Sequence, residues 1–165
     1  MTICGDENGG AQAATATLRI SFTALPDEVR RVLGQVRHWL ERRRISAANR
    51  GTIEIVLAEA LNNVVEHAYA GSVPGSVGLA LHIHDAAVLI AVHDRGRTLP
   101  AETPPVGAPR PDPATLPEGG FGWHLIDDLS QSICYAREAG CNRLCLRLAL
   151  QDHDSEEEGA PQEPP

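Results

Sequence analysis

The sequence contains no lysine, since all 14 of its basic residues are arginine. A Walker A phosphate-binding loop and the nucleotide-binding strand of an ordinary protein kinase both need a lysine. If this chain uses ATP, it must therefore do so through another fold.

The four cysteines include no C-x-x-C pair, which leaves a zinc site with little support. We expect Cys134 and Cys145, on predicted strands, to be small buried apolar residues.

Long apolar runs and basic stripes are also missing. No run reaches the roughly 18 apolar residues that span a bilayer, and segment 1–16 is polar rather than signal-like. We therefore expect a cytoplasmic protein without a membrane partner. The net charge of −8 comes from the two ends of the chain. Segment 151–165 has six acids and no basic residue, and segment 1–16 has two acids and no basic residue. The body between them is close to neutral, which argues against direct nucleic-acid binding.

The length of 165 residues suits one domain with a single core. Acidic ends, of which the C-terminal one also bears prolines, bury too little apolar surface to become ordered. We therefore predict a disordered arm at 1–16, one domain at 17–150 and an acidic disordered tail at 151–165. Segment 97–119 has seven of the twelve prolines and almost no periodicity, which is typical of a functional or disordered loop.

Hydropathy periods predict the elements of this domain. Alternation from Leu18 to Phe22 indicates a strand, Pro26 opens an amphipathic helix, and Ser46 caps a longer helix running to about Tyr69. Further strands are expected at 77–84, 87–94, 132–137 and 143–150, with a short helix at 121–129. This order predicts an α+β two-layer sandwich, with helices on one face of a mostly antiparallel, mixed sheet.

The long helix carries a line of polar residues. Glu59, Asn63 and His67 are spaced i, i+4, i+8 and therefore lie along one side of the helix. A carboxylate and an amide oxygen on adjacent turns could share a Mg²⁺, which takes oxygen ligands together with phosphate oxygens. The alternative is that this line is simply the solvated face of the helix.

Two further features carry candidate chemistry. Asp94 ends a strand and should point inward, where a lone carboxylate is costly unless a group such as an adenine amino pairs with it. Gly96 would let the backbone approach the adenine ring. Glycines at 119, 120 and 122 open the short helix, where free N–H groups bind phosphate. The alternatives are a turn-initiating aspartate and a flexible loop joint.

Read together, these segments resemble a known family. E-A-L-N-N-V-V-E-H-A-Y, from Glu59, resembles the N box of the GHKL (Bergerat-fold) ATP-binding proteins, in the form found in RsbW-like anti-sigma-factor serine-protein kinases. V-H-D-R-G resembles their first glycine box and G-G-F-G-W-H-L-I their second. The resemblance covers the chain from about Ala16 to Leu150.

The resemblance implies a role for each matched residue. Glu59 is expected to be the general base that orients and deprotonates a serine hydroxyl of a protein substrate. Asn63 is expected to bind the Mg²⁺ that bridges the ATP phosphates. Asp94 is expected to hydrogen-bond the adenine amino group, with Gly96 beneath the ring.

The same resemblance implies that Gly120 and Gly122 cradle phosphates and that 97–119 is the ATP lid. The chain departs from the family pattern at several positions. Arg97 replaces a second glycine of the first box, and Cys141 and Asn142 occupy the region of a usual threonine.

The implied function is an anti-sigma factor that binds a sigma factor. It would use ATP and Mg²⁺ to phosphorylate a serine on a STAS-type antagonist, and it would form a homodimer. One alternative is a related stress-switch kinase. Another, favoured by the altered glycine boxes, is a nucleotide-responsive binding module without kinase activity. A detached histidine-kinase ATPase domain is less favoured, because no helical phosphoacceptor module precedes Ala16.

Three other features are given structural interpretations. His82, His84 and His93 could share one sheet face, which we interpret as an exposed or partner-facing surface rather than a metal site. Trp39 lies in a helical apolar stripe and is interpreted as core. The run 42–44 of arginines is interpreted as a solvated helix end, with a sigma-factor contact as the alternative.

Overall fold

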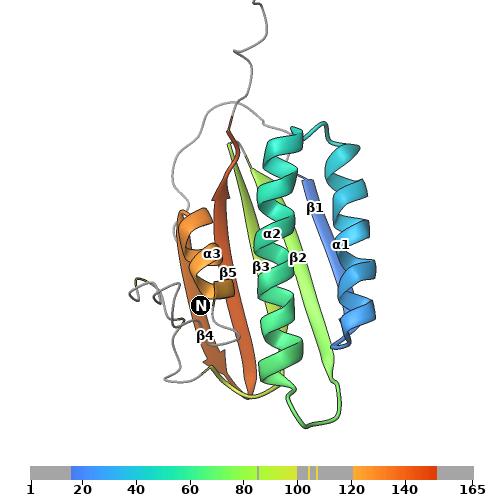
Figure 1. The fold of residues 1–165 in the computed structure, drawn as a ribbon, viewed down its shortest axis with the longest axis vertical. Coiled ribbons are helices and arrows are strands. Elements are labelled where there is room, and N and C mark those ends of the chain that lie inside the picture. Colours follow the sequence, from blue (N-terminus) through green and yellow to red (C-terminus); the bar gives the residue numbers. More distant parts are fainter. Residues whose placement is uncertain (1–15, 85, 100–103, 105–106, 108–120, 152–165) are drawn as a thin grey trace, which may run out of the picture.

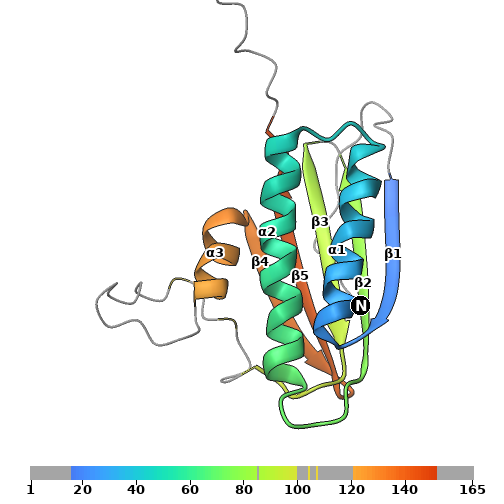
Figure 2. The ribbon, with the colours of Figure 1, turned by 45° about the vertical axis from the view of Figure 1, so that its right-hand side comes forward.

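The computed structural model describes residues 16–84, 86–99, 104, 107 and 121–151, with the side chain of Phe121 left out. The described residues form a five-stranded antiparallel sheet with its helices on one face, which confirms the predicted two-layer α+β sandwich (Figures 1 and 2). Apart from Ala16 and Gln151, the predicted arm and the predicted tail lie outside the described residues, as do Gly119, Gly120 and most of the predicted lid.

All predicted elements are present within a few residues of their expected bounds. The strands are β1 (Ala16–Thr23), β2 (Ser76–His84), β3 (Ala87–Asp94), β4 (Ser132–Glu138) and β5 (Cys141–Ala149). The helices are α1 (Pro26–Glu41), α2 (Ala47–Asn63), the π-helical segment η1 (Val64–Ala68) and α3 (Phe121–Leu129). The strand order is β1-β2-β3-β5-β4, and each neighbouring pair is antiparallel. No parallel pair occurs among the described strands, so this part of the sheet is antiparallel rather than mixed.

Local sequence signals account for the helix starts. Pro26 stands at the start of α1, where its missing N–H costs nothing, and two acids occupy the first turn. The Ser46 side chain accepts a hydrogen bond from the Asn49 N–H at 3.2 Å, which confirms Ser46 as the N-cap of α2. The predicted long helix ends at Ala68, one residue before Tyr69, and its last five residues form η1, with wider π turns. Such turns are frequent at functional sites.

The core lies between the sheet and the helices. Its fully buried side chains include Val32 and Val36 from α1, Leu57 from α2, and Leu81 and Ile90 from the sheet. Burial of each such side chain contributes about 1.5–3 kcal/mol. The inward face of β3 continues to Asp94, as its alternation predicts. This continuation places a carboxylate at the edge of an apolar core.

The structure differs from the sequence-based interpretation of two single residues, Trp39 and Cys134. Trp39 is only partly buried and packs against the rim of the core. Cys134 is exposed, so the expectation of a buried residue is wrong there; it lies on the face of β4 opposite Ile133 and Tyr135. In the part of the chain that the structure describes, no helix is both long and apolar enough to cross a membrane.

Candidate nucleotide-binding site

The residues of the polar line on the long helix differ in how far they are exposed to solvent, so the line is not simply a solvated face. Glu59 and Asn63 are half-buried, whereas His67 is exposed. The first two residues lie on α2, which packs directly against α3, and Figure 1 shows α2 between α1 and α3. Glu59 and Asn63 therefore face the interior of the site, and His67 faces solvent.

Asn63 has an incomplete set of hydrogen bonds. Its side-chain Nδ2 is buried and has no hydrogen-bond partner among the described residues. A buried polar group without a partner costs roughly 1–3 kcal/mol, so such atoms are rare outside functional sites. This amide has two N–H donors on Nδ2 and an oxygen that can act as a ligand, at the position where the resemblance places the Mg²⁺ and phosphates of ATP.

Gly122 lies directly against the carboxylate of Glu59. A Cβ atom added at Gly122 would stand 2.3 Å from Glu59 Oε2, which is shorter than any real contact of this kind. Only glycine therefore fits while Glu59 keeps this position. The contact brings the first turn of α3 to the polar line of α2, so two segments about 60 residues apart in sequence form one side of the site.

Asp94 is 6% exposed and is held by two donors. The Gly96 N–H and the Asn142 Nδ2 each donate to Asp94 Oδ1 at 2.8 Å. Both hydrogen bonds recorded for this carboxylate within the described residues thus end on Oδ1. The arrangement fixes the carboxylate plane and leaves Oδ2 to accept from a further donor, such as an exocyclic amino group.

Asn142 is a residue of the candidate site to which the sequence analysis assigned no contact or role. It is 3% exposed and lies opposite Asp94 in the β3–β5 pairing. Besides binding Asp94, its Nδ2 donates to the Arg97 carbonyl at 3.0 Å, and its Oδ1 accepts from Tyr135 Oη at 2.8 Å and from Arg137. Arg137 also donates to the Gly96 carbonyl at 3.0 Å. The buried Asn142 amide therefore links Asp94, the candidate binding group for adenine, to the segment that follows β3.

The segment after β3 is also fastened to the end of η1. The Arg97 N–H donates to the Ala68 carbonyl at 2.7 Å, and the Arg95 N–H donates to Tyr69 Oη at 3.1 Å. A Cβ at Gly96 would lie 2.5 Å from the Ala68 carbonyl oxygen, so this close approach requires glycine. The tyrosine of the E-x-x-x-N-x-x-x-H-x-Y pattern thus anchors the first glycine box.

His82, His84 and His93 lie on the face of the sheet away from the helices. His82 and His84 stack with ring centroids 6.2 Å apart, and no group of three or more His, Cys, Asp or Glu able to hold a metal occurs among the described residues. His93 lies on the opposite face from Asp94. Burial and the nearby Arg143 guanidinium lower the pKa of His93 below its usual value of 6.5, although the Asp94 carboxylate acts in the opposite direction.

The described candidates form two groups joined by η1. Glu59, Asn63 and Gly122 form the first, and Asp94 and Gly96 form the second. The chemistry of these groups fits Mg·ATP, because it offers oxygen ligands, a helix N-terminus and an acceptor for an amino group. This is the arrangement of the GHKL class of ATP-binding domains that the sequence motifs resemble.

The chain belongs to the histidine kinase-like ATPase domain family, whose model matches residues 22–148. This match confirms the family predicted from the sequence. It also supports the use of ATP.

Relatives with assigned names are protein kinases. The chain is 31% identical over 139 residues to the serine/threonine-protein kinase BtrW of Bordetella bronchiseptica, covering 80% of this chain and 92% of that one. It is 32% identical over 93 residues to the serine-protein kinase RsbW of Halalkalibacterium halodurans, covering 53% of this chain and 56% of that one.

A solved structure shares the fold. The crystal structure of the RsbU and RsbW domains of a Mycobacterium tuberculosis protein matches with a TM-score of 0.59 and 23% identity. The match covers 82% of this chain and 32% of that longer chain.

Proposed function

We propose that this chain is an ATP-dependent protein-serine kinase that acts as an anti-sigma factor. The observation that carries the proposal is the buried Asp94, whose two recorded hydrogen bonds both end on Oδ1. Burying a carboxylate is costly, and this one keeps an acceptor oxygen for a ligand. Family membership and the serine-protein kinases among the relatives support the same function.

The side chains of the site have distinct proposed roles. Asp94 would accept a hydrogen bond from the adenine amino group, and the N-terminus of α3, with Gly120 and Gly122, would bind phosphate oxygens. Asn63 would hold Mg²⁺ through its amide oxygen. When bound, Mg²⁺ supplies positive charge that bridges and neutralises the phosphate oxygens. Glu59 would orient the attacking serine hydroxyl and accept its proton.

The partners follow from the same proposal. The chain would bind a sigma factor in the cytoplasm and phosphorylate a serine of a STAS-type antagonist, acting as a homodimer. Segment 97–119 would cover the nucleotide, and the terminal segments 1–16 and 151–165 would flank the ATP-binding domain without forming its core. A stress-switch kinase would share the site and differ only in its protein partners.

The altered first glycine box favours a second candidate. Arg97 stands where a second glycine is usual, and its N–H is bound to the Ala68 carbonyl at 2.7 Å. This departure favours a nucleotide-responsive binding module without kinase activity.

Phosphate transfer separates these functions. The purified chain is incubated with Mg²⁺, γ-labelled ATP and a STAS-type protein, alongside a Ser→Ala variant of that protein. We expect transfer that requires the serine and falls about 10²–10⁴-fold in Glu59→Gln, since general base catalysis contributes that much. ATP affinity should be almost unchanged in Glu59→Gln. ATP binding without transfer would instead establish the binding module, and equal transfer by Glu59→Gln would remove Glu59 as the base.

A further inference from the structure

A groove lies on the side of the molecule away from the candidate nucleotide site. It runs between α1 and the edge strand β1 and has a volume of about 1080 Å³. Its apolar lining includes Leu18 and Ile20 from β1, Ile83 from β2 and Trp39 from α1. Figure 2 shows β1 at the outer edge of the sheet beside α1, whereas α3 lies beyond α2.

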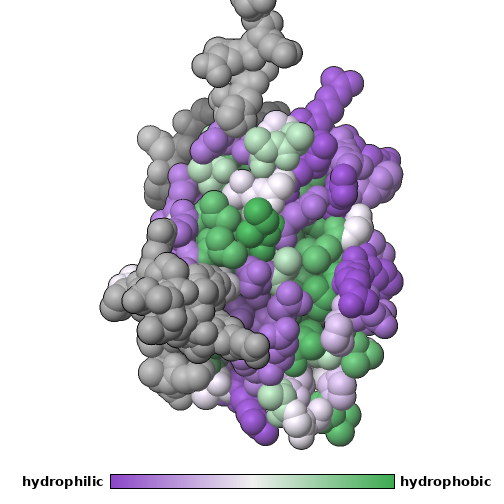
Figure 3. Space-filling model, viewed as in Figure 1, coloured by the Kyte–Doolittle hydropathy of each residue, from purple (hydrophilic) through white to green (hydrophobic). Residues whose placement is uncertain are grey.

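The rim of this groove is basic. Arg19, Arg31, Arg42 and Arg43 all line it, and no aspartate or glutamate does. Sequence reading found no basic stripe, because these arginines come from two elements and gather only in the fold. The surface over α1 is mostly hydrophilic (Figure 3).

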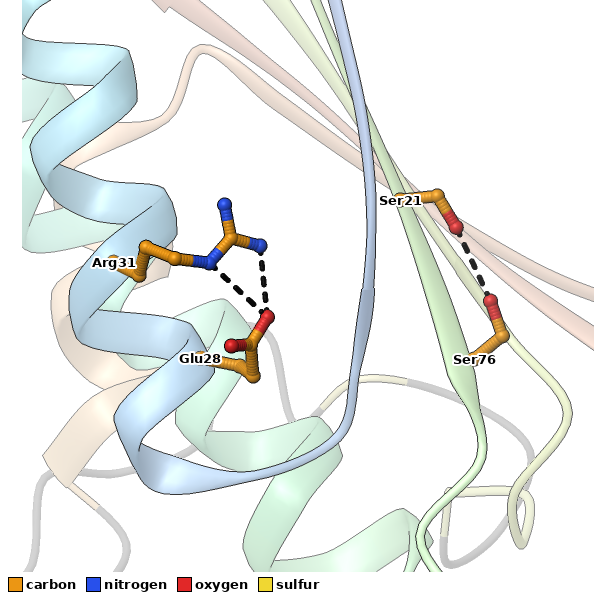
Figure 4. A network of polar contacts seen from close by, with 4 residues as sticks. All are labelled: Ser21, Glu28, Arg31 and Ser76. Carbon is orange, nitrogen blue, oxygen red and sulfur yellow. Dashed lines mark hydrogen bonds and ion pairs between the residues drawn. The ribbon is translucent and has the colours of Figure 1, made fainter.

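Two of the rim arginines already have local partners. Arg31 donates to the Glu28 carboxylate at 2.7 Å, and Figure 4 shows this pair on the side of α1 that faces β1. The Arg43 guanidinium lies 3.9 Å from the centroid of the Trp39 ring. These contacts hold both guanidinium groups beside the groove.

Arg19 and Arg42 differ from this pair. Neither has an ion-pair partner among the described residues. Other acids of α1 are used elsewhere, since Asp27 pairs with Arg30 and Glu41 with Arg37. The groove therefore presents positive charge that the described part of the chain does not neutralise.

The described chain leaves the fold next to this groove. Gln151 exchanges two hydrogen bonds with the Asn49 side chain in the first turn of α2, at 2.9 and 3.0 Å. Asn49 also donates to Ser46, which directly follows the groove residue Ile45. Segment 152–165 thus starts at the end of the groove marked by Arg42 and Ile45.

Segment 152–165 has the complementary charge and sufficient length. It contains six acids and no lysine or arginine, and three of the acids are consecutive at Glu156, Glu157 and Glu158. Fourteen residues can extend to about 46 Å at roughly 3.3 Å each. The groove from Arg42 back to Arg31 spans about 17 Å of helix at 1.5 Å per residue. The segment can therefore follow the whole rim.

We propose that segment 152–165 binds in this groove of its own chain, with its carboxylates on the arginine rim. The contact neutralises Arg19 and Arg42 and covers Trp39. Because α1 and α3 lie on opposite sides of α2, the bound segment leaves the candidate nucleotide site open. It shields the α1–β1 face from acidic surfaces of other proteins.

The two tryptophans provide the test. Labelling the full chain with 5-fluorotryptophan gives one ¹⁹F signal from Trp39 in the groove and one from Trp123 in α3 as an internal control. The intact chain is compared with the triple variant Glu156→Gln, Glu157→Gln, Glu158→Gln. We expect the Trp39 signal to shift between them in dilute salt and the Trp123 signal to stay unchanged. The shift should vanish near 1 M salt, where the screening length falls to roughly 3 Å.

A matched pair of arginine variants locates the contact. Arg42→Gln should reproduce the Trp39 shift of the triple variant. Arg30 lies in α1 but outside the groove, so Arg30→Gln should leave the Trp39 signal unchanged. Equal Trp39 signals in the intact chain and the triple variant, or equal effects of the two arginine variants, would overturn the proposal. A Trp39 shift that grows with protein concentration would also overturn it, because the segment would then bind a second copy.

Discussion

Replacing Asn142 by alanine should weaken both the fold and nucleotide binding. The change removes two hydrogen bonds with charged groups, to the Asp94 carboxylate at 2.8 Å and from the Arg137 guanidinium. It also removes neutral bonds to the Arg97 carbonyl and Tyr135. A bond to a charged group contributes about 1.5–3 kcal/mol and a neutral one about 0.5–1.5 kcal/mol. Water entering the space recovers part of this sum. We expect a net loss of about 3 kcal/mol in the free energy of unfolding, from a total of about 5–15 kcal/mol.

The effect on ATP follows from the same contacts. Without the Asn142 donor, the Gly96 N–H is the one donor left to the Asp94 carboxylate among the described residues, so the carboxylate can rotate away from adenine. We expect the Kd for Mg·ATP to rise about tenfold, which corresponds to about 1.4 kcal/mol. Urea unfolding and calorimetry measure the two quantities. Asn49→Ala is the matched control, because it removes two hydrogen bonds far from the site. If Asn142→Ala lost no more stability and ATP affinity than this control, the assigned role of Asn142 would be refuted.

Two further predictions concern Gly122 and His93. Gly122→Ala should displace the Glu59 carboxylate and slow phosphate transfer. In a Glu59→Ala background, the same change should slow transfer almost no further. Additive effects of the two changes in this double-mutant cycle would contradict the contact. Because burial and Arg143 lower the pKa of folded His93 below 6.5, the unfolded chain binds the proton first as the pH falls. Stability should therefore decrease below about pH 6.5, and His93→Gln should remove that part of the decrease in urea unfolding. An unchanged pH slope in His93→Gln would refute this assignment.

The elements of the fold could be predicted from sequence because each has a strong local signal. Alternation defines the strands, Pro26 and Ser46 define two helix starts, and the turn between β4 and β5 forms at Ala139 and Gly140. Both turn residues have positive φ, 49° and 75°, as a two-residue hairpin turn requires. The π turns of η1 could not be predicted, because α and π turns place nearly the same apolar residues inward over five positions.

The site was only partly predictable, since its side chains meet through the sheet register. Asp94 has a signal of its own, because the alternation of β3 sends it inward. Asn142 has a weaker signal, because the sequence shows only that it stands, with Cys141, in the region of a threonine usual in the family, and not what it contacts. Only the β3–β5 pairing places Asn142 opposite Asp94. The arginine-rimmed groove was missed for the same reason, because Arg19 and Arg42 are 23 positions apart in the sequence.

The central claim is that the Asp94 carboxylate and the Asn63 amide bind Mg·ATP, and calorimetry on the purified full chain tests it directly. The unaltered chain should bind Mg·ATP, whereas Asp94→Asn and Asn63→Ala should each bind it much more weakly or not at all. Asn63→Ala should also lose the dependence of ATP affinity on Mg²⁺, while Asp94→Asn should keep it. No binding by the unaltered chain up to about 1 mM ATP, where the binding free energy is only about −4.1 kcal/mol, would contradict the account.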